Sequence, residues 1–121
     1  MNINQRDVLL LPHPLENGHH SPHPHIVLSV QEANQHENTF IAVMITSSSF
    51  TKDDFSFNLN DATFEKPLAK SGCHARMHLI TITRELWFDH NNKVNTMKPA
   101  PFNELMKSIG DLVFNYNFTP Q

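Results

Sequence analysis

The chain has little cysteine, little glycine and no long apolar run. Its single cysteine, Cys73, excludes an internal disulfide and makes a reducing cytoplasm the natural setting. Its three scattered glycines exclude a glycine-rich loop that cradles phosphates. No apolar stretch approaches the ~20 residues of a membrane span, and no basic segment precedes an apolar one as in a signal peptide. We therefore expect a cytoplasmic protein that does not enter the membrane.

Positive charge is also scarce. The formal net charge is −3 with histidines neutral, which is not typical of a strongly nucleic-acid-binding protein. Nine histidines change the local balance, because an ordinary imidazole titrates near ~6.5 and a nearby phosphate raises its pKa. The overall charge argues weakly against an RNA partner, and the local charge leaves RNA open.

Short alternating apolar segments dominate what is present. The length of 121 residues, 39% hydrophobic content and nine phenylalanines indicate one folded domain over residues 1–121. Apolar residues recur at helical spacing from Asn103, a suitable N-cap, to Tyr116. The pattern predicts strands at 8–11, 25–30, 39–46, 55–59 and 73–83, a hairpin within 86–94, and a helix over 103–116.

Many short strands followed by one helix predict a mainly β fold. Because closure removes exposed strand edges, we expect a small closed antiparallel barrel with a C-terminal α-helix. In the longest strand, Cys73 lies on an apolar face and reads as core. The opposite face predicts a solvated sheet surface or a dimer contact. That face carries His74, Arg76 and His78.

Two neighbouring segments end in polar residues. They are His23-Pro24-His25-Ile26-Val27-Leu28-Ser29 and Ile41-Ala42-Val43-Met44-Ile45-Thr46-Ser47. In order and spacing the chain resembles the MazF/PemK family, the ribosome-independent RNA-cleaving toxins of bacterial type II toxin–antitoxin systems. That family has an Arg-Pro pair opening a strand that ends Val-Leu-Ser, and an Ile-Thr ending the next strand. Here His23 stands at the arginine position. The resemblance covers about residues 6 to 86, including Arg6 to Pro12, Glu32-Ala33-Asn34 and Leu68 to Ile82.

The resemblance implies an SH3-like barrel that acts as an endoribonuclease toxin without a cofactor. It implies single-stranded RNA as substrate, a cognate antitoxin protein that neutralises the activity, and a homodimer. Cleavage by attack of the RNA 2′-hydroxyl leaves a 2′,3′-cyclic phosphate and a 5′-hydroxyl.

Carried over by position, the catalytic residues would be His23, Thr46 and His25. The Thr46 hydroxyl could donate to a phosphate oxygen. Histidine cannot copy the bidentate fork of arginine, but it can act as a general acid or base near neutral pH. If the strand is regular, His25 shares a face with His23 and completes an acid–base pair. Substrate binding would fall to Ser47, Arg76, His74 and His78, with Arg76 supplying the missing fixed cation.

Other interpretations stay open. Thr46 could be an ordinary strand residue, and His23 and His25 could be surface histidines of a loop rich in proline and histidine. His19-His20 and His23-x-His25 suggest adventitious metal binding, but their spacing lacks a designed ligand set, so we predict no metal and no cofactor. The alternative function is a catalytically inactive barrel that lost the arginine and serves as a protein or nucleic-acid binding module.

Overall fold

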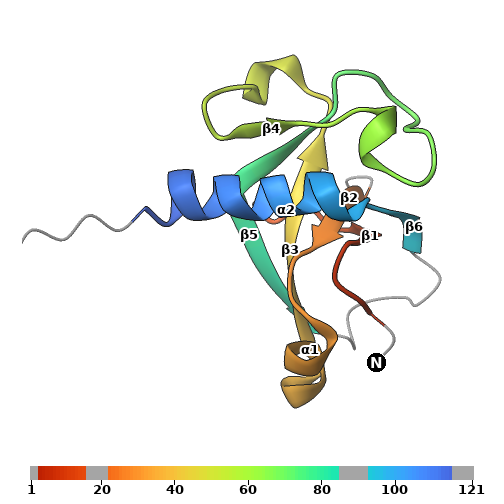
Figure 1. Ribbon diagram of the computed structural model, residues 1–121, viewed down its shortest axis with the longest axis vertical. Helices are drawn as coiled ribbons and strands as arrows, with labels where there is room; N and C mark the ends of the chain where they lie inside the picture. The colour runs from red at the N-terminus through yellow and green to blue at the C-terminus, as the bar shows by residue number, and fades with distance from the viewer. Residues whose placement is uncertain (1–2, 16–21, 85–92, 116–121) are drawn as a thin grey trace, which may run out of the picture.

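A single antiparallel sheet of six strands forms most of the molecule (Figure 1). The computed structural model describes residues 3–15, 22–84 and 93–115. The strands are β1 (Asp7–Leu11), β2 (His23–Val27), β3 (Thr39–Thr46), β4 (Ser56–Asn58), β5 (His74–Arg84) and β6 (Lys93–Thr96). Their order in the sheet is β4-β5-β3-β2-β1-β6. The predicted mainly β fold is confirmed. The hairpin predicted within 86–94 lies outside the described residues, apart from the start of β6.

Two helices accompany the sheet, α1 (Gln31–Glu37) and α2 (Pro99–Ser108). A π-helical turn at Ile109–Val113 continues α2. The predicted start of this helix was wrong, because α2 begins at Pro99 and Asn103 lies inside it. Prolines are tolerated in a first helical turn, where the backbone N–H groups have no intrahelical acceptor. No helix in the described parts of the chain is long and apolar enough to cross a membrane.

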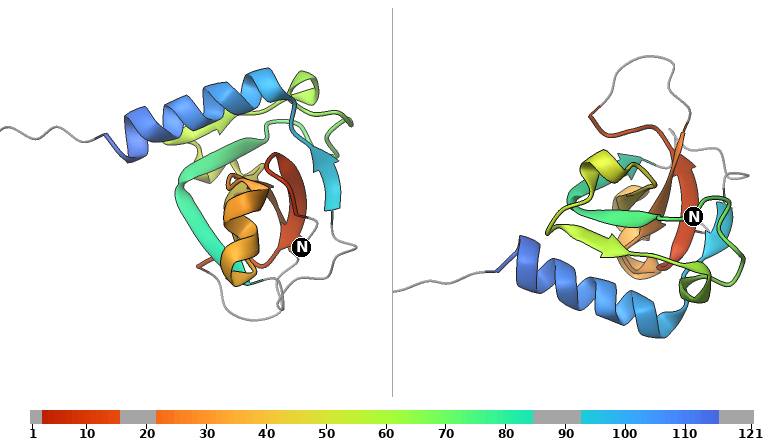
Figure 2. Two further views of the ribbon diagram at one scale, coloured as in Figure 1. Left: turned by 60° about the horizontal axis from the view of Figure 1, so that its bottom comes forward. Right: turned by 90° about the horizontal axis from the view of Figure 1, so that it is seen from above.

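The sheet curls, and α2 runs along its open side (Figure 2). Phe102 and Leu105 of α2 and Ile109 of the π-helical turn belong to the same buried cluster as Val8 and Val43 of the sheet. A second, smaller cluster lies on the other face of the sheet. It contains Ile3, Leu9, Leu11, Val27, Phe40 and Ala42. Apolar residues on both faces explain the nearly continuous hydrophobic run of β1.

The predicted closure of the barrel was wrong. Among the described strands, β4 and β6 are the two ends of the sheet and do not pair with each other. A single antiparallel bridge between Phe64 and Met97 connects the chain segments that follow β4 and β6. The helix α2 covers this side through Phe102 and Leu105, so a helix rather than a strand ladder completes the enclosure of the core.

The polar face of β5 also differs from the prediction of a solvated surface. His74 is fully buried and Arg76 is 6% exposed, whereas His78 is exposed. The segment between β3 and β4, which includes a short 3-10 turn at Ser49–Thr51, lies over the first two side chains. Alternation along a strand reveals which side chains share a face, but not whether a loop covers that face.

Candidate functional site

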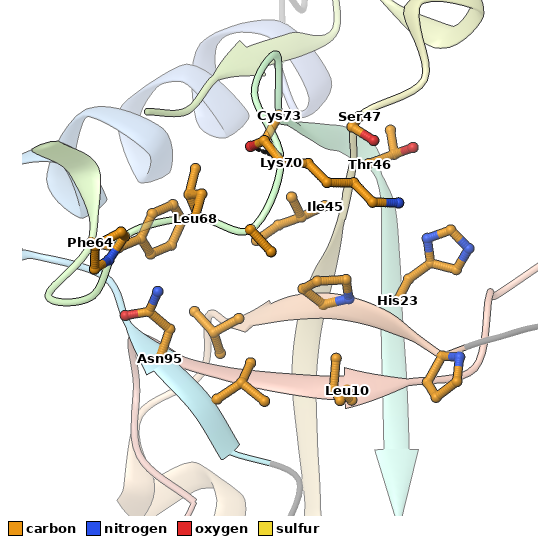
Figure 3. A pocket seen from close by; sticks show the side chains of 16 residues that line it. Leu10, His23, Ile45, Thr46, Ser47, Phe64, Leu68, Lys70, Cys73 and Asn95 are labelled. Carbon is orange, nitrogen blue, oxygen red and sulfur yellow. Dashed lines mark hydrogen bonds between the residues drawn. The ribbon is translucent and has the colours of Figure 1, made fainter. Parts of the chain in front are cut away.

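A pocket of about 490 Å³ lies where β2 begins and β3 ends (Figure 3). Its walls are mainly apolar. The side chains of His23, Thr46, Ser47 and Lys70 form a polar end, and Asn95 lies at the opposite end. The lining residues are Val8, Leu10, Pro22, His23, Pro24, Ile45, Thr46, Ser47, Phe64, Pro67, Leu68, Ala69, Lys70, Cys73, Val94 and Asn95. Three of the residues predicted from sequence are therefore brought together here. They are His23, Thr46 and Ser47.

The pairing of β2 with β3 explains why His23 and Thr46 meet. The two strands are antiparallel, with His25 opposite Met44. Two residues further along the same register come His23 and Thr46, at matching ends of the two strands. Both side chains are half-buried, and Figure 3 shows the His23 ring pointing toward Thr46. The Thr46 hydroxyl oxygen also accepts a hydrogen bond from the backbone N–H of Ser48, 3.2 Å away.

His25 does not join this site. It is 1% exposed and does not line the pocket, so it is not available there to form an acid–base pair with His23. His25 lies between the buried residues Leu9 of β1 and Met44 of β3, whereas His23 stands at the start of β2, where the strand is only half-buried. The Nδ1 atom of His25 lies 2.8 Å from the carbonyl oxygen of His23, whereas Nε2 has no hydrogen-bond partner in the described structure. Burial lowers the pKa of His25 to about 4, against the raising effect of the hydrogen bond to His23, so the ring is neutral at neutral pH.

A second histidine that sequence reasoning missed lies beside His23. The rings of His13 and His23 meet edge to face, with centroids 5.3 Å apart and planes at 80°. The Nδ1 atom of His13 accepts a hydrogen bond from the backbone N–H of Leu15 at 3.1 Å, which leaves the ring proton on Nε2. His13 follows β1 directly, and its place in a loop rich in histidine was the only signal in the sequence.

Lys70 is the other residue that the sequence analysis missed. It lies in the chain segment between β4 and β5, and Figure 3 shows its ammonium end directed toward Thr46 and His23. The backbone N–H of Leu68 donates to Asp61 Oδ1 at 2.8 Å, and the Cys73 thiol donates to the Lys70 carbonyl oxygen at 3.2 Å. The signal available in the sequence was the position of Lys70 between Leu68 and Ser71 in the late segment of the family resemblance.

The structure does not bring His74, Arg76 or His78 to the pocket. His74 Nε2 lies 3.1 Å from the Thr51 hydroxyl. Arg76 forms an ion pair with Asp53, and this pair holds the pKa of the Asp53 carboxyl at about 2. His78 is exposed, with its ring 5.5 Å from that of Phe55. Arg76 is thus engaged elsewhere and is not a fixed cation at the His23 position.

The cysteine and the possible metal ligands give no further chemistry here. Cys73 lines the pocket and is half-buried against the core cluster. Burial raises the pKa of the Cys73 thiol, which keeps it protonated and a poor nucleophile. Within residues 3–15, 22–84 and 93–115, no three His, Cys, Asp or Glu side chains come together in a way that could hold a metal ion.

Comparison with known proteins identifies the family. The sequence matches the family described as PemK-like, MazF-like toxin of type II toxin–antitoxin system over residues 4–112, and the chain belongs to this family. A search of curated protein sequences gives no match.

Solved structures support the same fold at low sequence identity. An endoribonuclease from Mycobacterial species in complex with its cognate antitoxin matches with a TM-score of 0.70 and 14% identity, over 93% of this chain and 95% of that one. A second endoribonuclease from Mycobacterial species gives a TM-score of 0.68 and 11% identity, over 93% of this chain and 91% of that one. MazF from Deinococcus radiodurans gives a TM-score of 0.63 and 14% identity, over 93% and 96%.

Proposed function

We propose that this protein is an endoribonuclease toxin that cleaves single-stranded RNA by transesterification. The observation that carries the proposal is the meeting of His23 and Thr46 at the polar end of one pocket. These are the two positions at which the family resemblance locates catalysis. Membership of the toxin family and the fold shared with endoribonucleases support the proposal.

The reaction assigns a task to each of these side chains. Neutral His23 accepts the proton of the RNA 2′-hydroxyl, whose oxygen then attacks the adjacent phosphorus. The bond between phosphorus and the 5′-oxygen breaks, and the leaving oxygen takes a proton from water. Thr46 donates its hydroxyl hydrogen to a non-bridging phosphate oxygen and stabilises the charge that develops there. The products are a 2′,3′-cyclic phosphate and a 5′-hydroxyl, and no cofactor takes part.

The shape of the pocket suits an unpaired nucleotide. Apolar side chains such as Leu10, Ile45 and Leu68 form walls beside the polar end. An unstacked base can lie against apolar walls while its phosphate remains at the polar end, and a base held in a duplex cannot do so. This arrangement favours single-stranded RNA as the substrate. Ser47, exposed next to Thr46, is positioned to contact the same nucleotide.

His13 has a positioning role in this scheme. Its edge-to-face contact with His23 limits rotation of the His23 ring. The roles first considered for His25, His74, Arg76 and His78 are not carried into the proposal, because none of these residues lines the pocket.

The proposal includes protein partners. One of the similar structures is an endoribonuclease in complex with its cognate antitoxin. By analogy, we infer that a cognate antitoxin neutralises this protein. From the family resemblance we infer a homodimer, and from the single cysteine a reducing cytoplasm as the setting.

A second candidate function has one observation in its favour. The arginine expected from the family is replaced by His23, and the buried Arg76 is paired with Asp53 rather than replacing it. A barrel without that arginine could bind RNA or protein in the same pocket without cleaving it. Cleavage assays separate the two functions.

The test compares His23→Ala and Thr46→Ala with the unmodified protein on single-stranded RNA. Each change should lower the cleavage rate by about 100-fold or more, because each removes one catalytic group. His78→Ala is the matched control, since this exposed histidine lies on β5 away from the pocket and should leave the rate unchanged. Cleavage that survives both pocket changes would contradict the proposed site. Absence of cleavage in the unmodified protein, with RNA still bound, would favour the binding module.

A further inference from the structure

The charge in the pocket comes from one residue. Within the described residues, Lys70 is the only lining side chain with a formal charge at neutral pH, and no carboxylate lines the pocket. Figure 3 shows the ammonium group of Lys70 on the same side as the Thr46 hydroxyl and the His23 ring. Among the described residues, none accepts a hydrogen bond from this ammonium group, and none forms an ion pair with it.

Three other cations of the described structure have structural partners. Arg6 donates to the Met97 carbonyl oxygen at 2.9 Å, and Lys93 pairs with the buried carboxylate of Asp7 at 3.0 Å. Arg76 is held by Asp53 at 2.9 Å. These positive charges are already used in holding strands and loops together, whereas that of Lys70 faces a cavity.

We propose that Lys70 binds the phosphate of the RNA strand at the His23–Thr46 site. Its positive charge takes the role of the family's arginine, whose position His23 occupies here. The inference rests on the proposed ribonuclease function and adds a residue to it. The lysine ammonium is a compact charge on a flexible stem and binds phosphate without the two-point geometry of arginine. The hydroxyls of Thr46 and Ser47 then supply the directional hydrogen bonds that a guanidinium would have given.

The local structure holds the backbone of Lys70 in place. On the N-terminal side of Lys70, the backbone N–H of Leu68 donates to the Asp61 carboxylate. On the C-terminal side, the Cys73 thiol donates to the carbonyl oxygen of Lys70. Gly72 has a φ of +71°, a conformation that residues with side chains rarely adopt, and this turns the chain back into β5. With the backbone fixed, the flexible lysine stem can place the charge at the pocket without ordering a whole loop.

Binding of a single-stranded DNA oligonucleotide tests the inference without cleavage, because DNA lacks the 2′-hydroxyl that would attack. Lys70→Ala should weaken binding about tenfold at moderate salt, the effect of losing one charge-assisted contact. It should also reduce the slope of log affinity against log salt by about 0.7. Lys66→Ala is the matched control, because Lys66 is an exposed lysine of the same segment that does not line the pocket. The control should bind as the unmodified protein does.

Cleavage of RNA by the same variants gives the second measurement. Lys70→Ala should lower kcat/KM about 100-fold, Lys70→Arg should retain most of it, and Lys66→Ala should not change it. Equal DNA binding by Lys70→Ala and the unmodified protein, or an equal effect of Lys66→Ala, would overturn the inference. If Lys70 contributes to DNA binding but no variant cleaves RNA, the phosphate contact stands and the proposed ribonuclease function fails. If RNA is cleaved and Lys70→Ala has no effect on cleavage or binding, the ribonuclease function stands and the role of Lys70 fails.

Discussion

Arg76 and Asp53 form a two-point ion pair that fixes the segment between β3 and β4 against β5. The Nη1–Oδ1 distance is 2.9 Å and the Nη2–Oδ2 distance is 3.1 Å. Arg76 Nη1 also donates to the Ser56 hydroxyl at 3.0 Å and to the carbonyl oxygen of Thr51. A guanidinium with this many acceptors is satisfied where it lies, so Arg76 stabilises the fold and does not bind substrate.

Replacing Arg76 should therefore affect stability and not catalysis. Arg76→Met should lower the free energy of unfolding by roughly 2–4 kcal/mol, because several charge-assisted hydrogen bonds of a buried side chain are lost. Urea denaturation measures this loss, with Lys52→Ala on the same exposed segment as the control expected to have little effect. The rate of RNA cleavage per folded molecule should stay unchanged. A stable but inactive Arg76→Met protein would show that Arg76 acts on the substrate after all.

His25 should make the protein less stable in mild acid. Its pKa is about 4 in the folded state, below the value of 6.5 for a free imidazole, so the folded state favours the neutral ring. The contribution of neutral His25 to the free energy of unfolding is fully present above pH 6.5. It is lost as the pH falls from 6.5 toward 4, because the unfolded chain then binds a proton that the folded protein does not. The total loss attributable to this one group is about 3 kcal/mol.

Denaturation at pH 7.5 and at pH 4.5 tests this prediction. His25→Asn removes the titrating ring but keeps an amide that can donate to the His23 carbonyl, so its stability should change less between the two pH values. Asp53 does not interfere in this window, since its pKa is lowered to about 2 and its contribution is lost only below about pH 4. An identical pH dependence in His25→Asn and the unmodified protein would contradict the prediction.

The packing of α2 on the sheet can be tested at one buried leucine. Leu105 is fully buried in the cluster that joins α2 to the sheet, whereas its neighbour Met106 is 38% exposed. Leu105→Ala should lower the free energy of unfolding by about 2–5 kcal/mol, and Met106→Ala should cost much less. Equal costs in the two variants would mean that α2 does not pack as described.

Apolar side chains left on the surface agree with the proposed homodimer. Phe50 is 98% exposed, Ile82 is 69% exposed and Phe55 is 39% exposed. Phe57, two residues after Phe55, packs against the core cluster instead. Light scattering at micromolar concentration should give twice the mass of the chain. A monomer under these conditions would contradict the homodimer.

The strands could be predicted because their signal is local. β3 contains Phe, Ile and Val in an eight-residue run, and its predicted bounds, Thr39 to Thr46, agree with the structure. The helix α1 could not be predicted in this way, because it has no apolar stripe. Its one buried residue is Asn34, whose side chain is held by the Ser29 hydroxyl and by the carbonyl oxygen of Ile3. Polar contacts of this kind follow from the tertiary structure and leave no periodic pattern.

The candidate site was predictable only in part, for the same reason. His23 and Thr46 could be found by resemblance and by their place at the ends of strands that pair in order. Lys70 reaches the site from a segment distant in sequence, and His13 from the loop before β2, and no periodic pattern connects either residue with the site. His25 was misplaced because alternation shows which side chains share a face of β2, but not at which residue that face becomes buried.

The chemical nature of the RNA ends tests the central claim most directly. The cut in a mixed-sequence single-stranded RNA is first mapped, and the substrate is then remade with one 2′-deoxy sugar on the 5′ side of the scissile phosphate. Mass spectrometry should find a 2′,3′-cyclic phosphate and a 5′-hydroxyl on the unmodified RNA, and no cleavage at the deoxy position. A 3′-hydroxyl with a 5′-phosphate, or undiminished cleavage at the deoxy position, would contradict attack by the 2′-hydroxyl at the His23–Thr46 site.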